Sequence, residues 1–150
     1  MVAIILIIAA IAIPNLLRAR LAANESSGVS QLRTLNTAEM SYNNAYSAVG
    51  YGSLNHLGGA ASPCLPSSAT ACLIDNSFAT NYNGQGKSGY SFAITLINNN
   101  SYFTATAAPL VPNASGVNSF CSNEDAVVRK DSSGAVDSVH DTCAGMPAIQ

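Results

Sequence analysis

The chain has 150 residues, of which 48% are hydrophobic and only 9% are charged, with a formal net charge of −2. This length accommodates one domain with one long extension, and an average soluble chain carries about 25% charged residues. The six cations are scattered apart from the pairs Arg18/Arg20 and Arg129/Lys130, which are too sparse for a nucleic-acid-binding face. The composition therefore predicts no nucleic-acid partner and disfavours a cytosolic enzyme.

The first 13 residues, MVAIILIIAAIAI, contain no polar side chain. The run fits a buried core helix, the core of a signal peptide or part of a membrane span, but a complete span needs about 20 apolar residues. A cleaved signal carries its positive charge before the apolar run, whereas Arg18 and Arg20 follow it. By the positive-inside rule, these arginines would also hold the domain that follows them in the cytoplasm. That location conflicts with disulfides, which the four cysteines indicate and which persist in oxidising compartments. We expect further residues, including a basic leader, to precede Met1.

A helix is predicted to continue from Asn15 to about Ser47, with a kink or local melting just before Pro14, which has no amide to donate. An apolar stripe recurs at spacings of three, four or seven residues, at Leu32, Leu35, Tyr42, Tyr46 and Val49. The polar residues expected to face away from it are Gln31, Arg33, Asn36, Asn43 and Asn44. The second half of the helix should therefore pack on a domain while the first half projects.

Beyond the helix, residues 48–88 are rich in Gly, Ser, Pro and Asn and predict a long connector with one or two short helices. Residues 89–97 and 101–108 alternate in polarity around an Asn-rich turn and predict an antiparallel hairpin. Further strands are expected near 126–130 and 135–139, joined by the turn D-S-S-G. The predicted fold is α+β, with a long N-terminal helix whose C-terminal half packs on a small antiparallel sheet.

The predicted organisation has two parts. Residues 1–17 form a projecting hydrophobic helix segment. Residues 18–150 form a globular domain that consists of a helix, a connector and a sheet with a C-terminal disulfide region, at 18–47, 48–88 and 89–150.

The four cysteines, Cys64, Cys72, Cys121 and Cys143, are an even number and indicate two disulfides in an oxidising compartment. Three pairings are possible, and the sequence alone does not choose among them. We expect the sequential pairing, Cys64–Cys72 and Cys121–Cys143, because it closes two short loops. A structural zinc site would require close C-x-x-C or His spacings, which the sequence lacks.

No catalytic motif is present: the sequence has no G-x-S-x-G, H-E-x-x-H, Walker A or Rossmann glycine pattern. Four acidic residues near the C-terminus lack the spacing of an EF-hand and are better explained by turns: Glu124, Asp125, Asp131 and Asp137. His140 is expected to be a solvated surface group. We therefore expect no enzyme activity, no metal and no cofactor.

The stretch AIILIIAAIAIPNLLRARLAANES resembles the N-terminal helix of type IV pilins and of the related pseudopilins of type II secretion systems. In that family an apolar run ends in an A-I-A-I-P block and is followed by a helix that turns polar; the resemblance covers about residues 2–45. Aligned on Pro14, the family's first residues would lie upstream of Met1. They include a glutamate that pairs with a neighbouring subunit's amino terminus, and its role is carried by no residue of this sequence.

The resemblance implies a structural subunit that polymerises into a type IV pilus-like extracellular filament. The implied filament-core residues are Val2, Ile4, Ile5, Leu6, Ile7, Ile8, Ile11, Ile13, Pro14, Leu16 and Leu17. Leu6 stands where many members have Gly, so less unwinding is expected there. A disulfide that ties back the C-terminal segment is also frequent in the family, and Cys121–Cys143 would supply it.

The partners implied by the resemblance are further copies of the chain in a helical homopolymer, the pilus assembly machinery and a prepilin peptidase. The implied location is an extracellular filament on the bacterial surface, with a pool in the inner membrane before assembly. Two alternatives stay open: a pseudopilin of a type II secretion system, and a membrane-anchored extracytoplasmic binding module.

Overall fold

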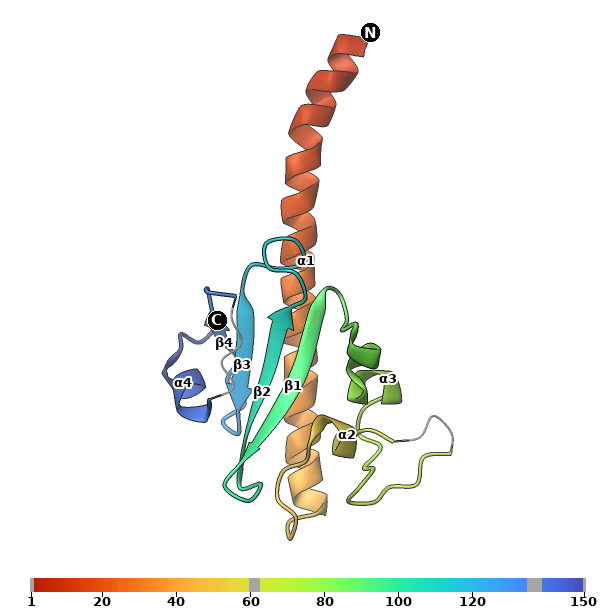
Figure 1. Cartoon of the computed structure of the whole chain (residues 1–150), viewed down its shortest axis with the longest axis vertical. Helices are drawn as coiled ribbons and strands as arrows, with labels where there is room; N and C mark the ends of the chain where they lie inside the picture. The colour runs from red at the N-terminus through yellow and green to blue at the C-terminus, as the bar shows by residue number, and fades with distance from the viewer. Residues whose placement is uncertain (1, 60–62, 135–138, 150) are drawn as a thin grey trace.

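A computed structural model describes residues 2–59, 63–134 and 139–149 (Figure 1). One long helix, α1 (Val2–Ala45), runs through the whole height of the molecule, and its C-terminal half lies against a four-stranded antiparallel sheet. The fold is therefore α+β, as predicted.

Helix α1 is continuous through Pro14. Of the two predicted alternatives, local melting before this residue is wrong, and a kink stays a prediction. Proline removes one helical hydrogen bond and clashes with the preceding turn. Its neighbours are largely Ala, Leu, Ile and Arg, which favour helix or disfavour it only weakly. The helix ends at Ala45, two residues before the predicted end, and the amide of Tyr46 still donates to the Tyr42 carbonyl at 2.8 Å.

The apolar stripe of α1 forms the centre of the core. Leu32, Leu35 and Tyr42 are fully buried, together with the aromatic residues Tyr90 and Phe103 from the sheet. Val49 was predicted to belong to the stripe but is exposed, because the helix ends before it.

Asn36 was predicted to face away from the sheet but is buried. Asn36 is only 3% exposed, and its side-chain amide donates to Ser122 Oγ at 2.7 Å. The prediction failed because it treated an amide as a surface group, whereas a buried amide with a hydrogen-bond partner is compatible with a core position.

The sheet is a meander in the order β1-β2-β3-β4. Its strands are β1 (Tyr90–Ile97), β2 (Tyr102–Pro109), β3 (Ser119–Asn123) and β4 (Arg129–Asp131). The predicted hairpin is confirmed, with Tyr90 opposite Pro109 and Ile97 opposite Tyr102.

The C-terminal strands differ in part from the prediction. The strand expected near 126–130 corresponds to β4, but β3 was not predicted, because its short sequence SFCSN lacks a clear apolar alternation. Residues 135–138 of the other expected strand lie outside the described residues. Val139 is not in a strand; it precedes helix α4 (His140–Gly145), which was also not predicted.

The connector carries helices α2 (Leu54–Leu57) and α3 (Asn76–Ala79) and a short 3-10 helix, η1 (Asn81–Gly84). It contributes to the core through Leu57 and Phe78, and the Phe78 ring meets the Phe92 ring edge-on with centroids 5.1 Å apart. The predicted loop with short helices is confirmed, and so is its disulfide, Cys64–Cys72.

Candidate functional site

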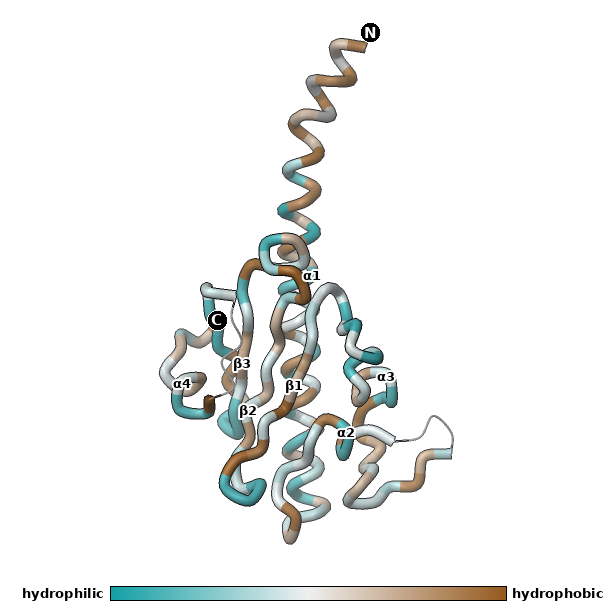
Figure 2. Tube along the Cα trace, in the orientation of Figure 1, coloured by the Kyte–Doolittle hydropathy of each residue, from teal (hydrophilic) through white to brown (hydrophobic). Residues whose placement is uncertain are grey.

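The N-terminal turns of α1 project beyond the sheet (Figure 1), and their residues are largely hydrophobic (Figure 2). Eight large aliphatic side chains are each 57–71% exposed: Val2, Ile5, Leu6, Ile8, Ile11, Ile13, Leu16 and Leu17. Successive helical residues are rotated by about 100°, so Ile5 and Leu6 point to different sides of the helix. The apolar surface therefore extends around much of the helix instead of forming one stripe.

This exposure is unfavourable in water. Moving one fully exposed large aliphatic side chain out of water contributes about 1.5–3 kcal/mol. The eight are only partly exposed, so together they contribute at most about 12–24 kcal/mol. Contiguous apolar surfaces of this kind mark sites of protein association or membrane contact. The projecting segment is therefore the strongest candidate for a functional surface.

Three further residues were predicted for this surface: Ile4, Ile7 and Pro14. The side chains of Ile4 and Ile7 lie outside the described part of the structure, and their role stays a prediction. Pro14 is exposed within the continuous helix. Across the described residues, no helix combines the length and the hydropathy that crossing a bilayer requires.

Where α1 enters the domain, it holds the loop between β2 and β3. Glu25 accepts hydrogen bonds from the backbone amides of Val117 and Asn118 at 2.9 and 3.1 Å, and Asn24 donates to the Ser115 carbonyl at 2.8 Å. Partial burial of Glu25 raises its pKa, but these amide donors outweigh it and hold the pKa of Glu25 below its ordinary value. The loop is thus fixed to the base of the projecting segment.

This loop exposes apolar side chains beside a cation. Leu110, Val111 and Val117 are all exposed, and Val111 lines a shallow hollow together with Arg20. In the described part of the chain, no carboxylate lies within ion-pair distance of Arg20. We call Arg20, Leu110, Val111 and Val117 the collar.

At the opposite end of β2, a groove of about 740 Å³ lies between the β1–β2 hairpin and α4. Its lining combines apolar and titratable side chains: Thr95, Ile97, Asn98, Tyr102, Val139, His140 and Asp141. The carboxylate of Asp141 is on the surface, with 98% of its side chain exposed.

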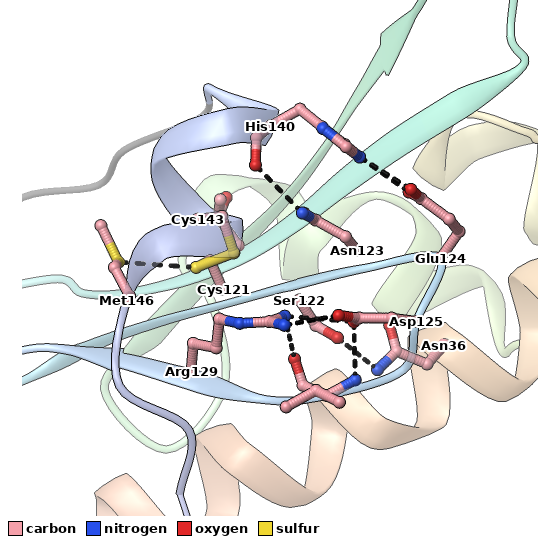
Figure 3. Close-up of a disulfide and its surroundings, with 12 residues drawn as sticks. Asn36, Cys121, Ser122, Asn123, Glu124, Asp125, Arg129, His140, Cys143 and Met146 are labelled. Carbon is pink, nitrogen blue, oxygen red and sulfur yellow. Dashed lines mark hydrogen bonds and ion pairs between the residues drawn. A yellow bond between two sulfur atoms is a disulfide. The ribbon is translucent and has the colours of Figure 1, made fainter.

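His140 at the edge of the groove lies between two carboxylates. Its Nε2 is 2.8 Å from Glu124 (Figure 3), and its Nδ1 is 3.2 Å from Asp141. Partial burial lowers the pKa of His140, but the hydrogen bonds to the two carboxylates outweigh it, and the pKa is raised above its ordinary value. His140, which was predicted to be a solvated surface group, is thus partly buried, with 23% of its side chain exposed, and paired with two acids.

The wall of the groove is anchored to the sheet by the second disulfide, Cys121–Cys143, which joins β3 to α4. Asn123 reinforces it by donating to the His140 carbonyl at 3.0 Å (Figure 3). The sequential pairing of the four cysteines is confirmed.

The acidic residues of this region have structural partners. Asp125 pairs with Arg129, whose guanidinium holds the pKa of Asp125 below its ordinary value, and Asp131 accepts from the Ser133 amide at 2.8 Å. Asp137 lies outside the described residues. Among residues 2–59, 63–134 and 139–149, no group of three or more His, Cys, Asp or Glu side chains is arranged to hold a metal ion.

Sequence reasoning missed one buried acid, Glu39. It is fully buried against the sheet, and its Oε2 accepts the Gly52 amide at 2.9 Å. Burial raises the pKa of Glu39 to about 8. Its sequence position could have indicated this burial. Glu39 lies between Leu35 and Tyr42 on the apolar stripe, where the helical spacing predicts a core residue.

Comparison of the chain with models of known protein families, with curated proteins and with solved structures finds no match. The architecture itself is pilin-like: a long helix with an exposed apolar N-terminal segment, packed by its second half on a four-stranded antiparallel sheet.

Proposed function

We propose that this chain is the repeating structural subunit of an extracellular filament of the type IV pilus kind. The observation that carries the proposal is the projecting segment of α1, whose eight described large aliphatic side chains are 57–71% exposed. In the filament, the same segments of neighbouring copies would pack together and bury this surface.

The proposed mechanism is a transfer between two apolar environments. Before assembly, lipid of the inner membrane would surround the projecting segment; after assembly, the helices of other copies would replace the lipid. Exposing these side chains to water would cost up to about 12–24 kcal/mol, and a direct transfer from lipid to the helix bundle avoids that exposure. This step would require an assembly machine and, before it, a peptidase that releases the mature subunit.

The two disulfides support the location. Disulfides persist in oxidising compartments outside the cytoplasm, and both bonds lie in the domain that follows the projecting segment. The domain would therefore be exposed on the outer side of the membrane and on the filament surface.

The proposal is tested with Ile11→Asp in the full chain, expressed in a piliated bacterial host that lacks its own major pilin. A carboxylate at the centre of an apolar helix bundle costs about 2.5–3.5 kcal/mol, which corresponds to a loss of about a hundredfold. We expect filaments in sheared fractions and electron micrographs to disappear, while both disulfides form normally.

The matched control is Ile11→Leu, which keeps apolarity and volume and should keep filaments. Normal filament yield from Ile11→Asp would contradict the proposal. Filament length from the unsubstituted chain separates a surface pilus from the short periplasmic pseudopilus of a secretion system.

A further inference from the structure

The two ends of the domain carry complementary surfaces. The β2–β3 loop lies at the end of the domain from which α1 projects, and the β1–β2 turn lies at the far end (Figure 1). The collar (Arg20, Leu110, Val111 and Val117) is at the first end, and the groove lies beside the β1–β2 turn. Strand β2 joins them: Tyr102 begins the strand in the groove, and Leu110 follows its last residue in the collar. Seven strand steps separate Tyr102 from Pro109, a distance of roughly 23 Å.

Each surface combines exposed apolar side chains with charged groups. The outward-facing charges have opposite sign, Arg20 in the collar and Asp141 in the groove, while the Glu25 carboxylate beside Val117 accepts backbone amides. In the collar, Val111 lies beside Arg20, which has no carboxylate within ion-pair distance among the described residues. In the groove, Tyr102 and Val139 are exposed near Asp141. His140 contacts Glu124 at 2.8 Å and Asp141 at 3.2 Å. Two carboxylates thus share one imidazole, which leaves this side of the groove with a net negative charge, and Asp141, with 98% of its side chain exposed, is the carboxylate that faces outward.

From this arrangement we propose that the collar of one copy docks in the groove of the next copy along the filament. The inference rests on the filament function proposed above and adds the contact that sets the axial order of the domains. Val111 would enter the apolar part of the groove, and Arg20 would face Asp141.

The geometry explains why this contact would give a fibre. Two different surfaces on opposite ends of one molecule make a heterologous contact, which produces an open helical polymer when the rotation does not close. A self-complementary patch would instead produce a closed dimer. The apolar helices would supply most of the cohesion, and the collar–groove contact would fix the register between neighbouring domains.

Cysteine cross-linking tests the contact directly, with Val111→Cys and Tyr102→Cys combined in the full chain. A disulfide requires Cα atoms within about 7 Å. The length of β2, roughly 23 Å, lies between Tyr102 at its start and Val111 beyond its end, so the two cysteines cannot join within one chain. Mild oxidation of sheared filaments should therefore give a ladder of covalent multimers in a denaturing gel. Each single substitution should give none, and neither should the control pair Val111→Cys with Ser41→Cys, whose second position is exposed on α1.

A charge exchange in the same double-cysteine chain tests the ion pair. Asp141→Lys should lower the yield of the ladder about fivefold, which corresponds to 1 kcal/mol for an exposed pair. Adding Arg20→Glu should restore it, because the two charges are then exchanged.

Filaments that form normally but give no ladder would overturn the collar–groove contact and leave the filament function standing. If the chain with both Arg20→Glu and Asp141→Lys cross-links no better than the chain with Asp141→Lys alone, the proposed Arg20–Asp141 pairing is overturned. Absence of filaments from the unsubstituted chain would overturn the proposed function and this inference together.

Discussion

At the scale of single residues, the most consequential feature of the core is the acid on the buried face of α1. Glu39 and Asn36 are three residues apart and therefore neighbours on the helix surface. Each has one buried oxygen without a hydrogen-bond partner in the described structure, Oε1 of Glu39 and Oδ1 of Asn36. A proton on Glu39 Oε1 would remove the charge from this buried, unpaired oxygen, and burial accordingly raises the pKa of Glu39 to about 8. The neutral acid is therefore the form that fits this site.

Glu39 should make stability depend on pH. Its folded pKa of about 8 is above the ordinary value of 4.5, so the folded chain binds the proton more tightly than the unfolded chain. Its contribution is fully present below about pH 4.5 and is lost as pH rises to about 8, by at most about 5 kcal/mol. We expect the free energy of unfolding, measured by denaturant titration in detergent micelles, to fall across this range.

Glu39→Gln isolates the effect, because the amide mimics the protonated acid and does not titrate. The wild-type chain should lose more stability than this variant between pH 5 and 8. His140 also has a raised pKa and adds a loss in the same direction above its ordinary value, but its share is common to both chains. Identical pH profiles for the two chains would refute the assignment.

At the scale of elements, the disulfide Cys121–Cys143 decides whether α4 stays in place. Helix α4 has only six residues, and isolated helices shorter than about 12 residues are marginal in water. It is held to β3 by the disulfide, by burial of Cys143 and by the Asn123 hydrogen bond. The disulfide is the one covalent link among these, so we expect it to contribute most to the position of α4 and of the groove that α4 lines.

Replacing both Cys121 and Cys143 by Ala should lower the free energy of unfolding by about 3 kcal/mol, the loop-entropy contribution for a closed loop of this size. It should also abolish hydrogen-exchange protection in α4. Denaturant titration and amide exchange measure the two effects.

Replacing Cys64 and Cys72 by Ala is the control. This change opens a shorter loop in the connector, so α4 should keep its protection. Protected α4 amides in the Cys121/Cys143 variant would show that the helix does not need the bond.

At the scale of the whole molecule, the order of residues in the projecting segment separates a filament subunit from an anchored binding module. A lipid anchor needs only apolarity, whereas a helix bundle needs large and small side chains in register, because protein interiors are close-packed. Exposed Ala10 and Ala12 alternate with Ile11 and Ile13 in this segment.

Scrambling residues 2–13 at constant composition should therefore leave membrane retention unchanged. It should lower filament yield at least about tenfold, which a packing loss of 1.4 kcal/mol per subunit would produce. Fractionation and electron microscopy of the same cells give both quantities. A scrambled chain that assembles normally would favour the anchored module.

Much of this architecture follows from the sequence alone. The unbroken apolar run determined the long helix. The stripe at Leu32, Leu35 and Tyr42 determined its packed half, and the alternation of residues 89–108 determined the central hairpin. These patterns are local, because helical and strand periodicities repeat within a few residues and do not depend on the rest of the chain.

Tertiary structure alone decided the features that depend on distant residues. Asn36 and Glu39 are buried because β3 and the Gly52 amide supply partners that no local pattern reveals. Strand β3 and helix α4 are too short to be predicted from periodicity and exist through pairing and the second disulfide. The collar and the groove likewise arise from residues far apart in the sequence, which the β-meander places at the two ends of one strand. The exposed apolar helix was thus determined by its sequence, whereas the surfaces that would order its neighbours were determined by long-range packing.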